Sequence, residues 1–208
     1  MKIDTMMVGP IMTNCYLLQD EKHQVCAVID PGEEGDRIAE AVENSGCALQ
    51  YVLLTHGHYD HFNGLEALMR HYPDVPVYIH PKDAVENLRG AYALKFPRLD
   101  EAHQRWYAEG DTLQLGELTI RVMETPGHTS GSVCLLVEDA ILAGDTLFCG
   151  SCGRTDLPSG DYREILLSLG RLGRLEGNYR VYPGHDRATD LDRERRSNPY
   201  MRHGLTLA

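Results

Sequence analysis

The sequence predicts an α/β fold in which two β-sheets pack face to face and helices cover both outer faces, giving four layers in the order αββα. Two observations support this class. Short extended runs are numerous and alternate with amphipathic helical segments. The chain of 208 residues is large enough for one well-buried core and shows no linker between units. We therefore expect a single domain that spans residues 1–208.

The expected elements follow from the spacing of apolar residues. Nine runs are typical of strands, namely residues 6–8, 15–18, 25–29, 51–54, 77–79, 118–123, 133–137, 140–142 and 180–182. Apolar residues spaced by three and four indicate helices at residues 35–44, 62–71, 81–88 and 162–172. The mixed-charge run at 193–196 is typical of a solvated helix face.

The most informative motif follows the fourth extended run. Residues 56–61 read His-Gly-His-Tyr-Asp-His, so three imidazoles and a carboxylate fall within six positions. In this composition a chance H-x-H-x-D-H match has a probability of roughly two in a thousand. Zinc, iron and manganese prefer such ligands, and without a cation the crowded groups would titrate against one another. Because one ion rarely takes all four of such close residues, the motif indicates two ions that share the cluster.

Three later segments repeat one design, an extended apolar run that ends in small residues and then presents a ligand. His128 follows a Pro-Gly pair, Asp145 follows Ala-Gly, and His185 follows another Pro-Gly pair. Glycine and proline turn the chain sharply and let backbone approach an ion closely. Residues placed just past the carboxyl ends of neighbouring strands converge at one edge of a sheet, so we expect these three to join the first cluster.

Four motifs taken together carry a family resemblance: T-H-G-H-Y-D-H at 55–61, P-G-H-T-S-G-S at 126–132, A-G-D-T-L-F at 143–148 and P-G-H at 183–185. The set resembles the metallo-β-lactamase superfamily, in its glyoxalase II-like (hydroxyacylglutathione hydrolase) branch, and spans almost the whole chain. This resemblance implies the same αββα sandwich. The full-length enzymes carry a helical C-terminal extension that binds glutathione, and this chain resembles a short form without it.

The resemblance implies a complete set of ligands for two divalent ions, which we expect to be zinc, with iron or manganese as alternatives. One ion would be held by His56, His58 and His128, a second by Asp60, His61 and His185, and Asp145 would bridge the two. Three further residues could orient the ligands, with turn or capping roles as the alternative; they are Thr55, Asp30 and Thr129.

The implied reaction is hydrolysis of a thioester of the S-hydroxyacylglutathione type or of a related ester. A hydroxide that bridges the two ions would attack the acyl carbonyl, and Asp60 would act as the catalytic residue that orients it. A thiolate leaves without a strong general acid because its parent thiol has a pKa of about 8.5. Arg154 could bind an anionic small-molecule substrate through its planar fork, or form an ion pair with Asp156 or Asp161.

Three other interpretations stay open. The motif at 153–156 also resembles persulfide dioxygenase relatives, which would use one iron held by His56, His128 and Asp145. Another alternative is a non-catalytic diiron redox module, although such relatives usually replace the second motif histidine with glutamate and attach a flavin domain. A metal-stabilised binding protein without turnover would be favoured by a missing ligand, and no ligand is missing.

Composition narrows the classes of partner. The formal net charge of −11 repels phosphate backbones, and no basic stripe is present, so nucleic acid is not expected as a partner. The sequence contains no apolar stretch of membrane-spanning length and no secretory h-region, so we expect a cytoplasmic protein without membrane contact. The six scattered cysteines are typical of reduced thiols, and the C-x-x-C at 149–152 is expected to lie in a loop. The oligomeric state is not specified by the sequence.

Overall fold

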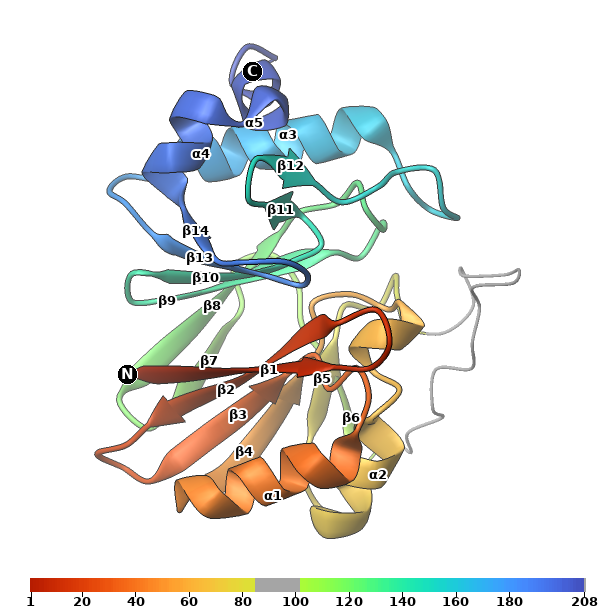
Figure 1. Cartoon of the computed structure of the whole chain (residues 1–208), viewed down its shortest axis with the longest axis vertical. Helices are drawn as coiled ribbons and strands as arrows, with labels where there is room; N and C mark the ends of the chain where they lie inside the picture. Colours follow the sequence, from red (N-terminus) through yellow and green to blue (C-terminus); the bar gives the residue numbers. More distant parts are fainter. Residues whose placement is uncertain (85–101, 208) are drawn as a thin grey trace.

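Two six-stranded sheets form the centre of the protein, here a computed structural model that describes residues 1–84 and 102–207 (Figure 1). The first sheet has its strands in sequence order: β1 (Lys2–Val8), β2 (Thr13–Asp20), β3 (Val25–Ile29), β4 (Ala48–Leu53), β5 (Val77–Ile79) and β6 (Gln104–Trp106). The pairings from β1 to β3 are antiparallel and those from β3 to β6 are parallel.

The second sheet has a different strand order. It runs β14 (Thr189–Asp190), β13 (Arg180–Pro183), β10 (Ala140–Gly144), β9 (Val133–Val137), β8 (Leu118–Glu124) and β7 (Thr112–Leu115). A separate two-stranded hairpin, β11 (Leu147–Phe148) with β12 (Ser151–Cys152), follows β10.

Helices cover the outer face of each sheet (Figure 1). The first sheet carries α1 (Gly35–Ser45) and α2 (Leu65–His71), and the second carries α3 (Tyr162–Gly173), α4 (Leu191–Ser197) and α5 (Pro199–Gly204). Three apolar clusters fill the spaces between the layers, and the central one joins the two sheets through residues such as Leu18, Ile29, Ile120 and Leu135. The αββα order expected from the sequence is therefore confirmed.

Several elements differ from the expectation. The helix expected at 62–71 begins only at Leu65, because residues 59–61 form a 3₁₀ turn that ends at Phe62, whose φ of −137° and ψ of −4° are not helical. Residues 81–84 of the helix expected at 81–88 form turns and a bend, and the remainder lies outside the described residues. The strands β6, β7, β11, β12 and β14 were not expected, because they are two to four residues long and mostly polar or irregular.

The last two helices begin at capping side chains. Asp190 accepts a hydrogen bond from the backbone N–H of Arg193, which starts α4 over the charged run expected to form a solvated helix face. Asn198 caps α5 in the same way and is followed by Pro199 at the first helical position. These signals were present in the sequence, although neither helix has a long apolar stripe.

The cysteines agree with the expectation of reduced thiols, but the C-x-x-C segment, expected to lie in a loop, ends in a short strand. All six cysteines are free, and the C-x-x-C segment forms the turn and second strand of the β11–β12 hairpin. Among the helices that the structure describes, none combines the length and the apolar character needed to cross a bilayer.

Candidate metal centre

The ligand-type residues follow strands that end at one edge of the fold. Strand β9 runs antiparallel to both β8 and β10, and β13 runs parallel to β10, so β8, β10 and β13 share one direction. Their carboxyl ends therefore meet, and they lead to His128, Asp145 and His185 respectively. The loop after β4 joins them from the first sheet, held by a hydrogen bond from the Val133 N–H to the Thr55 carbonyl (2.9 Å).

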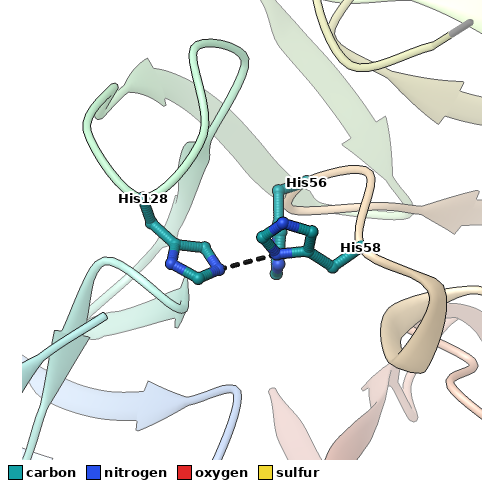
Figure 2. A group of neighbouring side chains, drawn as sticks. All are labelled: His56, His58 and His128. Atoms are coloured by element: carbon teal, nitrogen blue, oxygen red, sulfur yellow. Dashed lines mark hydrogen bonds between the residues drawn. The ribbon is translucent and has the colours of Figure 1, made fainter. Parts of the chain in front are cut away.

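The structure brings all seven expected ligand residues together. They form three groups, and within each group the ligand atoms lie within 4.8 Å of one another: His56, His58 and His128; Asp60, His61 and His185; and His56, His61 and Asp145. Figure 2 shows the first group, in which the loop with His56 and His58 faces the loop with His128. The third group shares one member with each of the others, so Asp145 lies between them.

Distances to Asp145 support this placement. One carboxylate oxygen, Oδ1, lies 3.4 Å from Nε2 of His61, and the other, Oδ2, lies 3.4 Å from Nε2 of His128 and 3.7 Å from Nε2 of His185. The carboxylate therefore approaches members of both three-residue groups, which is the position that a bridging ligand requires.

Hydrogen bonds fix which imidazole nitrogens face the centre. Nδ1 of His128 donates to the carbonyl of Arg154 (2.7 Å), and Nδ1 of His61 donates to Asp30 Oδ2 (2.9 Å). The Thr55 hydroxyl donates to Asp30, so its oxygen is left to accept from Nδ1 of His56 (3.1 Å). Nδ1 carries a proton in all three rings, so Nε2 is the nitrogen that points into the cluster and that would bind a cation as the neutral ring.

Unpaired atoms test whether these residues fit a cation. In the described part of the chain, the buried atoms without a hydrogen-bond partner include Nε2 of His56, His58 and His61 and Oδ1 of Asp145. Leaving a buried polar atom unpaired costs about 1–3 kcal/mol, so four in one cluster is a large destabilisation. Divalent cations would satisfy all of these acceptors at once, and the donor set of imidazoles and carboxylates suits zinc or iron.

The electrostatics of the cluster also favour bound positive charge. Burial, followed by the charge of His128, lowers the pKa of His58 to about 4, so this ring is neutral at pH 7. Burial opposes ionisation of Asp145, but His61, His128 and His185 outweigh it and lower its pKa to about 2. Burial likewise opposes protonation of His61, yet Asp145 and Asp30 raise its pKa well above the usual value. The carboxylates thus attract cations to this site.

Two of the three expected orienting residues contact the ligands. Asp30 accepts hydrogen bonds from the backbone N–H and hydroxyl of Thr55 (2.7 Å each) and from His61. Its own φ is +52°, a left-handed conformation that costs a non-glycine residue about 1–3 kcal/mol and persists only where surrounding bonds enforce it. The hydroxyl of the third, Thr129, donates instead to Asp83 (2.6 Å), so Thr129 supports the cluster through Asp83.

Asp83 is the supporting residue that the sequence reasoning missed. Its buried carboxylate accepts from the Gly57 N–H (2.9 Å), between two ligand histidines, and from the Thr129 hydroxyl. Its other oxygen accepts from the Gly131 N–H (2.9 Å). Asp83 therefore ties the loop of His56 to the loop of His128. It belongs to no recognisable motif, and only the fold brings its partners together.

Close backbone approach explains one of the glycines before a ligand. A Cβ on Gly184 would lie 2.2 Å from Asp145 Oδ1 and 2.7 Å from Cε1 of His61, well inside contact distance. Neither neighbour can retreat without moving a candidate ligand. The glycine before His185 is therefore required by the packing of the cluster.

Arg154 lies next to the centre through its backbone, whose carbonyl accepts from His128. Its guanidinium forms a bidentate pair with Asp156, with both nitrogen–oxygen distances at 2.7 Å. Of the two roles expected for Arg154, the ion pair with Asp156 is present. Substrate binding by Arg154 stays a prediction, and it would require the guanidinium to exchange Asp156 for a group of the substrate.

Comparison with known proteins places this geometry in a family. The model of the metallo-beta-lactamase superfamily matches residues 8–185. Probable metallo-hydrolase YqgX from Bacillus subtilis is 35% identical over the whole of both chains. Hydroxyacylglutathione hydrolase GloC from Haemophilus influenzae is 33% identical, and the match covers 97% of this chain and 98% of that one.

Solved structures give the same assignment. The B3 metallo-beta-lactamase BLEG-1 superposes with a TM-score of 0.86 at 29% identity, covering 96% of this chain and 99% of that one. ETHE1 from Myxococcus xanthus superposes with a TM-score of 0.80 at 31% identity, covering 96% of this chain and 84% of that one. TTHA1623 in a di-iron-bound form superposes with a TM-score of 0.80 at 32% identity, covering 95% of this chain and 99% of that one. The chain belongs to the metallo-β-lactamase superfamily.

Proposed function

We propose that this protein is a dinuclear metal-dependent hydrolase that cleaves a small-molecule thioester of the S-hydroxyacylglutathione type or a related ester. One observation carries the proposal: two groups of three ligand residues lie side by side, and Asp145 approaches both. His56, His58 and His128 would hold one ion, and Asp60, His61 and His185 the other. Ions held there would supply an activated water and a Lewis acid for the substrate carbonyl.

Asp60 is suited to orient the nucleophile. Its Oδ2 accepts from the Thr13 hydroxyl (3.1 Å) and lies 3.2 Å from Nε2 of His185 and 3.4 Å from Nε2 of His61. Burial opposes its ionisation, but His185 and His61 lower the pKa of Asp60 far below its ordinary value. The carboxylate therefore stays ionised and accepts a hydrogen bond, which makes it a positioning acceptor and a weak proton carrier.

A thioester fits the lack of an obvious acid among the ligands. The Nδ1 atoms of His56, His61 and His128 are already bonded to oxygen atoms, and their Nε2 atoms face the centre. With cations bound at these Nε2 atoms, none of the three rings would have a proton to give to a leaving group, and a thiolate needs none because its parent pKa is only about 8.5. The likeness to the hydroxyacylglutathione hydrolase GloC supports the same substrate class.

The identity of the metal is part of the proposal. We infer two zinc ions, since imidazoles and carboxylates without thiolate suit zinc. Two iron ions are the alternative, which the likeness to TTHA1623 in its di-iron-bound form supports.

A second candidate function is an iron-dependent oxygenase. His56 and Asp145 fall within one group, and His128 Nε2 lies 3.4 Å from Asp145 Oδ2, so these three side chains could hold a single iron with open positions. The likeness to ETHE1 is compatible with this alternative.

Metal content and two assays on the purified protein decide between them. We expect about two zinc or iron ions per chain and hydrolysis of S-D-lactoylglutathione without oxygen uptake. One iron per chain together with oxygen consumption in the presence of glutathione persulfide would overturn the hydrolase proposal in favour of the oxygenase. Activity in neither assay, at full metal content, would contradict both.

A further inference from the structure

A cavity of about 420 Å³ lies beside the loop that carries His185. Residues 186–188 line it, as does Asn14. The side-chain amide of Asn14 donates to the carbonyls of Pro183 (3.0 Å) and Asp186 (2.8 Å), which holds this loop in place. The cavity therefore lies against the residues that directly follow the candidate ligand His185.

The side of His185 is where the centre is most accessible. The His185 side chain is 22% exposed, against 10% for Asp60 and Asp145 and 0% for His61. A substrate that reaches the metals past His185 would extend into the neighbouring cavity.

Arg187 provides an unneutralised positive charge in this cavity. Its guanidinium is exposed, and within residues 1–84 and 102–207 its Nε donates to the Cys149 sulfur (3.4 Å) and no carboxylate pairs with it. Arg37, also in the cavity wall, is by contrast engaged by Glu34 (2.8 Å) and by the carbonyl of Met7 (3.1 Å). Asp186 is the acidic residue of the wall, and it forms no ion pair with Arg187.

The rest of the wall is largely apolar. Met6 and Met7 contribute thioether side chains. Tyr16 and Tyr182 contribute two rings that pack edge to face, with their centroids 5.6 Å apart. The Tyr16 hydroxyl is already bonded to the Pro183 carbonyl (2.5 Å), so the ring offers mainly its carbon surface. This combination suits a ligand with an apolar body and one anionic group.

We propose that Arg187 is the specificity-determining residue of a carboxylate subsite, so that the preferred substrate is a thioester with a carboxylate on its thiol or acyl part. A planar guanidinium can receive a carboxylate through two parallel hydrogen bonds, which fixes both position and orientation. The inference rests on the proposed hydrolase function, because it places the reacting carbonyl at the metals and the carboxylate at Arg187. The fork of Arg154 is by contrast taken by Asp156, so Arg154 would have to exchange this partner to bind a substrate carboxylate.

Matched substrates test the subsite. S-lactoyl-N-acetylcysteine and S-lactoyl-N-acetylcysteamine differ only in the carboxylate of the thiol, and S-succinyl- and S-pentanoyl-N-acetylcysteamine place the difference on the acyl part. In the wild-type protein we expect KM to be roughly tenfold lower for the carboxylate member of one pair, as for a charge-assisted hydrogen bond. The pair that shows the preference identifies which part carries the carboxylate.

Variants assign the preference to Arg187. Arg187→Ala should abolish it by raising KM for the charged member while leaving KM for the neutral member and kcat for both near their wild-type values. Arg187→Lys should retain part of it, since a lysine keeps the charge and loses the fork. Arg163→Ala removes an exposed arginine from α3 and should leave the preference unchanged.

A binding measurement separates this inference from the hydrolase proposal. The thioethers S-(2-oxopropyl)-N-acetylcysteine and S-(2-oxopropyl)-N-acetylcysteamine cannot be hydrolysed, and isothermal titration gives their affinities directly. Tighter binding of the charged thioether that is lost in Arg187→Ala supports the subsite even if no thioester is cleaved. Cleavage of both members of each pair with equal KM, or a preference that survives Arg187→Ala, would overturn the subsite and leave the hydrolase proposal intact. Equal binding of both thioethers, with no cleavage of any of the four thioesters, would overturn the hydrolase proposal and a subsite for a carboxylate on the thiol part.

Discussion

Replacing Asp83 tests whether a residue that contacts no metal sets the geometry of the candidate centre. Its carboxylate accepts three hydrogen bonds, from the Gly57 N–H, the Thr129 hydroxyl and the Gly131 N–H. Asp83→Ala would leave the Gly57 and Gly131 N–H groups without acceptors, while the Thr129 hydroxyl can turn to Ser132 Oγ (2.7 Å). At about 1–3 kcal/mol for each unpaired donor, the free energy of unfolding should fall by at least about 2 kcal/mol. That is a large part of the typical stability of a domain, and this variant is expected to fold poorly.

Asp83→Asn is the more informative change because it keeps the shape of the side chain. An amide has one acceptor oxygen, and placing it at Oδ2 preserves the bonds from Gly57 and Thr129 but turns the NH₂ toward the Gly131 N–H. One bond is lost and two donors face each other, so we expect a loss of about 1–3 kcal/mol in unfolding free energy. Zinc affinity should fall by roughly 10–100-fold, as for other residues that orient ligands.

Urea denaturation and zinc competition with a chromophoric chelator measure the two effects separately. Asp74→Asn, at an exposed position, is the matched control and should change neither. If Asp83→Asn lost stability but bound zinc with the affinity of the wild type, the role of the Asp83 hydrogen bonds would be purely structural. Wild-type values for both quantities would contradict the hydrogen-bond argument itself.

Three further changes probe the centre directly. Gly184→Ala should lower metal content in elemental analysis and abolish hydrolysis, because its Cβ would lie 2.2 Å from Asp145 Oδ1. Full metal content in this variant would show that the cluster can relax around the added methyl group. Asp145→Ala should remove turnover and reduce metal content, since the carboxylate approaches both ligand groups, and full turnover would refute its bridging role. Zinc added to the metal-free protein should raise the unfolding free energy by about 2.7 kcal/mol at one hundred times its Kd, and an unchanged denaturation midpoint would indicate that the unpaired imidazole atoms bind no cation.

The gathering of the candidate ligand residues could be predicted because their information is local. His56, His58, Asp60 and His61 lie within six positions, and each later ligand comes directly after a glycine, one to four positions past the end of a strand. Strand direction then brings them together, because β8, β10 and β13 share one direction. Sequence patterns of this kind encode both the residue type and the place in the fold where it will lie.

The short elements could not be predicted because their sequences carry no periodic signal. Strand β6 reads Gln-Arg-Trp and, among the described strands, pairs with β5 alone at an edge of the first sheet. Strands β11, β12 and β14 have two residues each, which is too few to show an alternation of polar and apolar residues. Their hydrogen bonds form because neighbouring elements already hold the chain in place.

Asp83 could not be predicted for a related reason, and its position explains how the ligand loop is held. Its partners are 26 to 48 positions away in the sequence, so nothing near it distinguishes it from a surface acid. In the fold, Asp30 binds the loop of residues 55–61 at Thr55 and His61, while Asp83 binds the same loop at Gly57. Two buried carboxylates outside the ligand set therefore hold the loop at three points. Because the protein's own hydrogen bonds fix the loop, the ligands are preorganised, and weakening either carboxylate should lower metal affinity before it unfolds the chain.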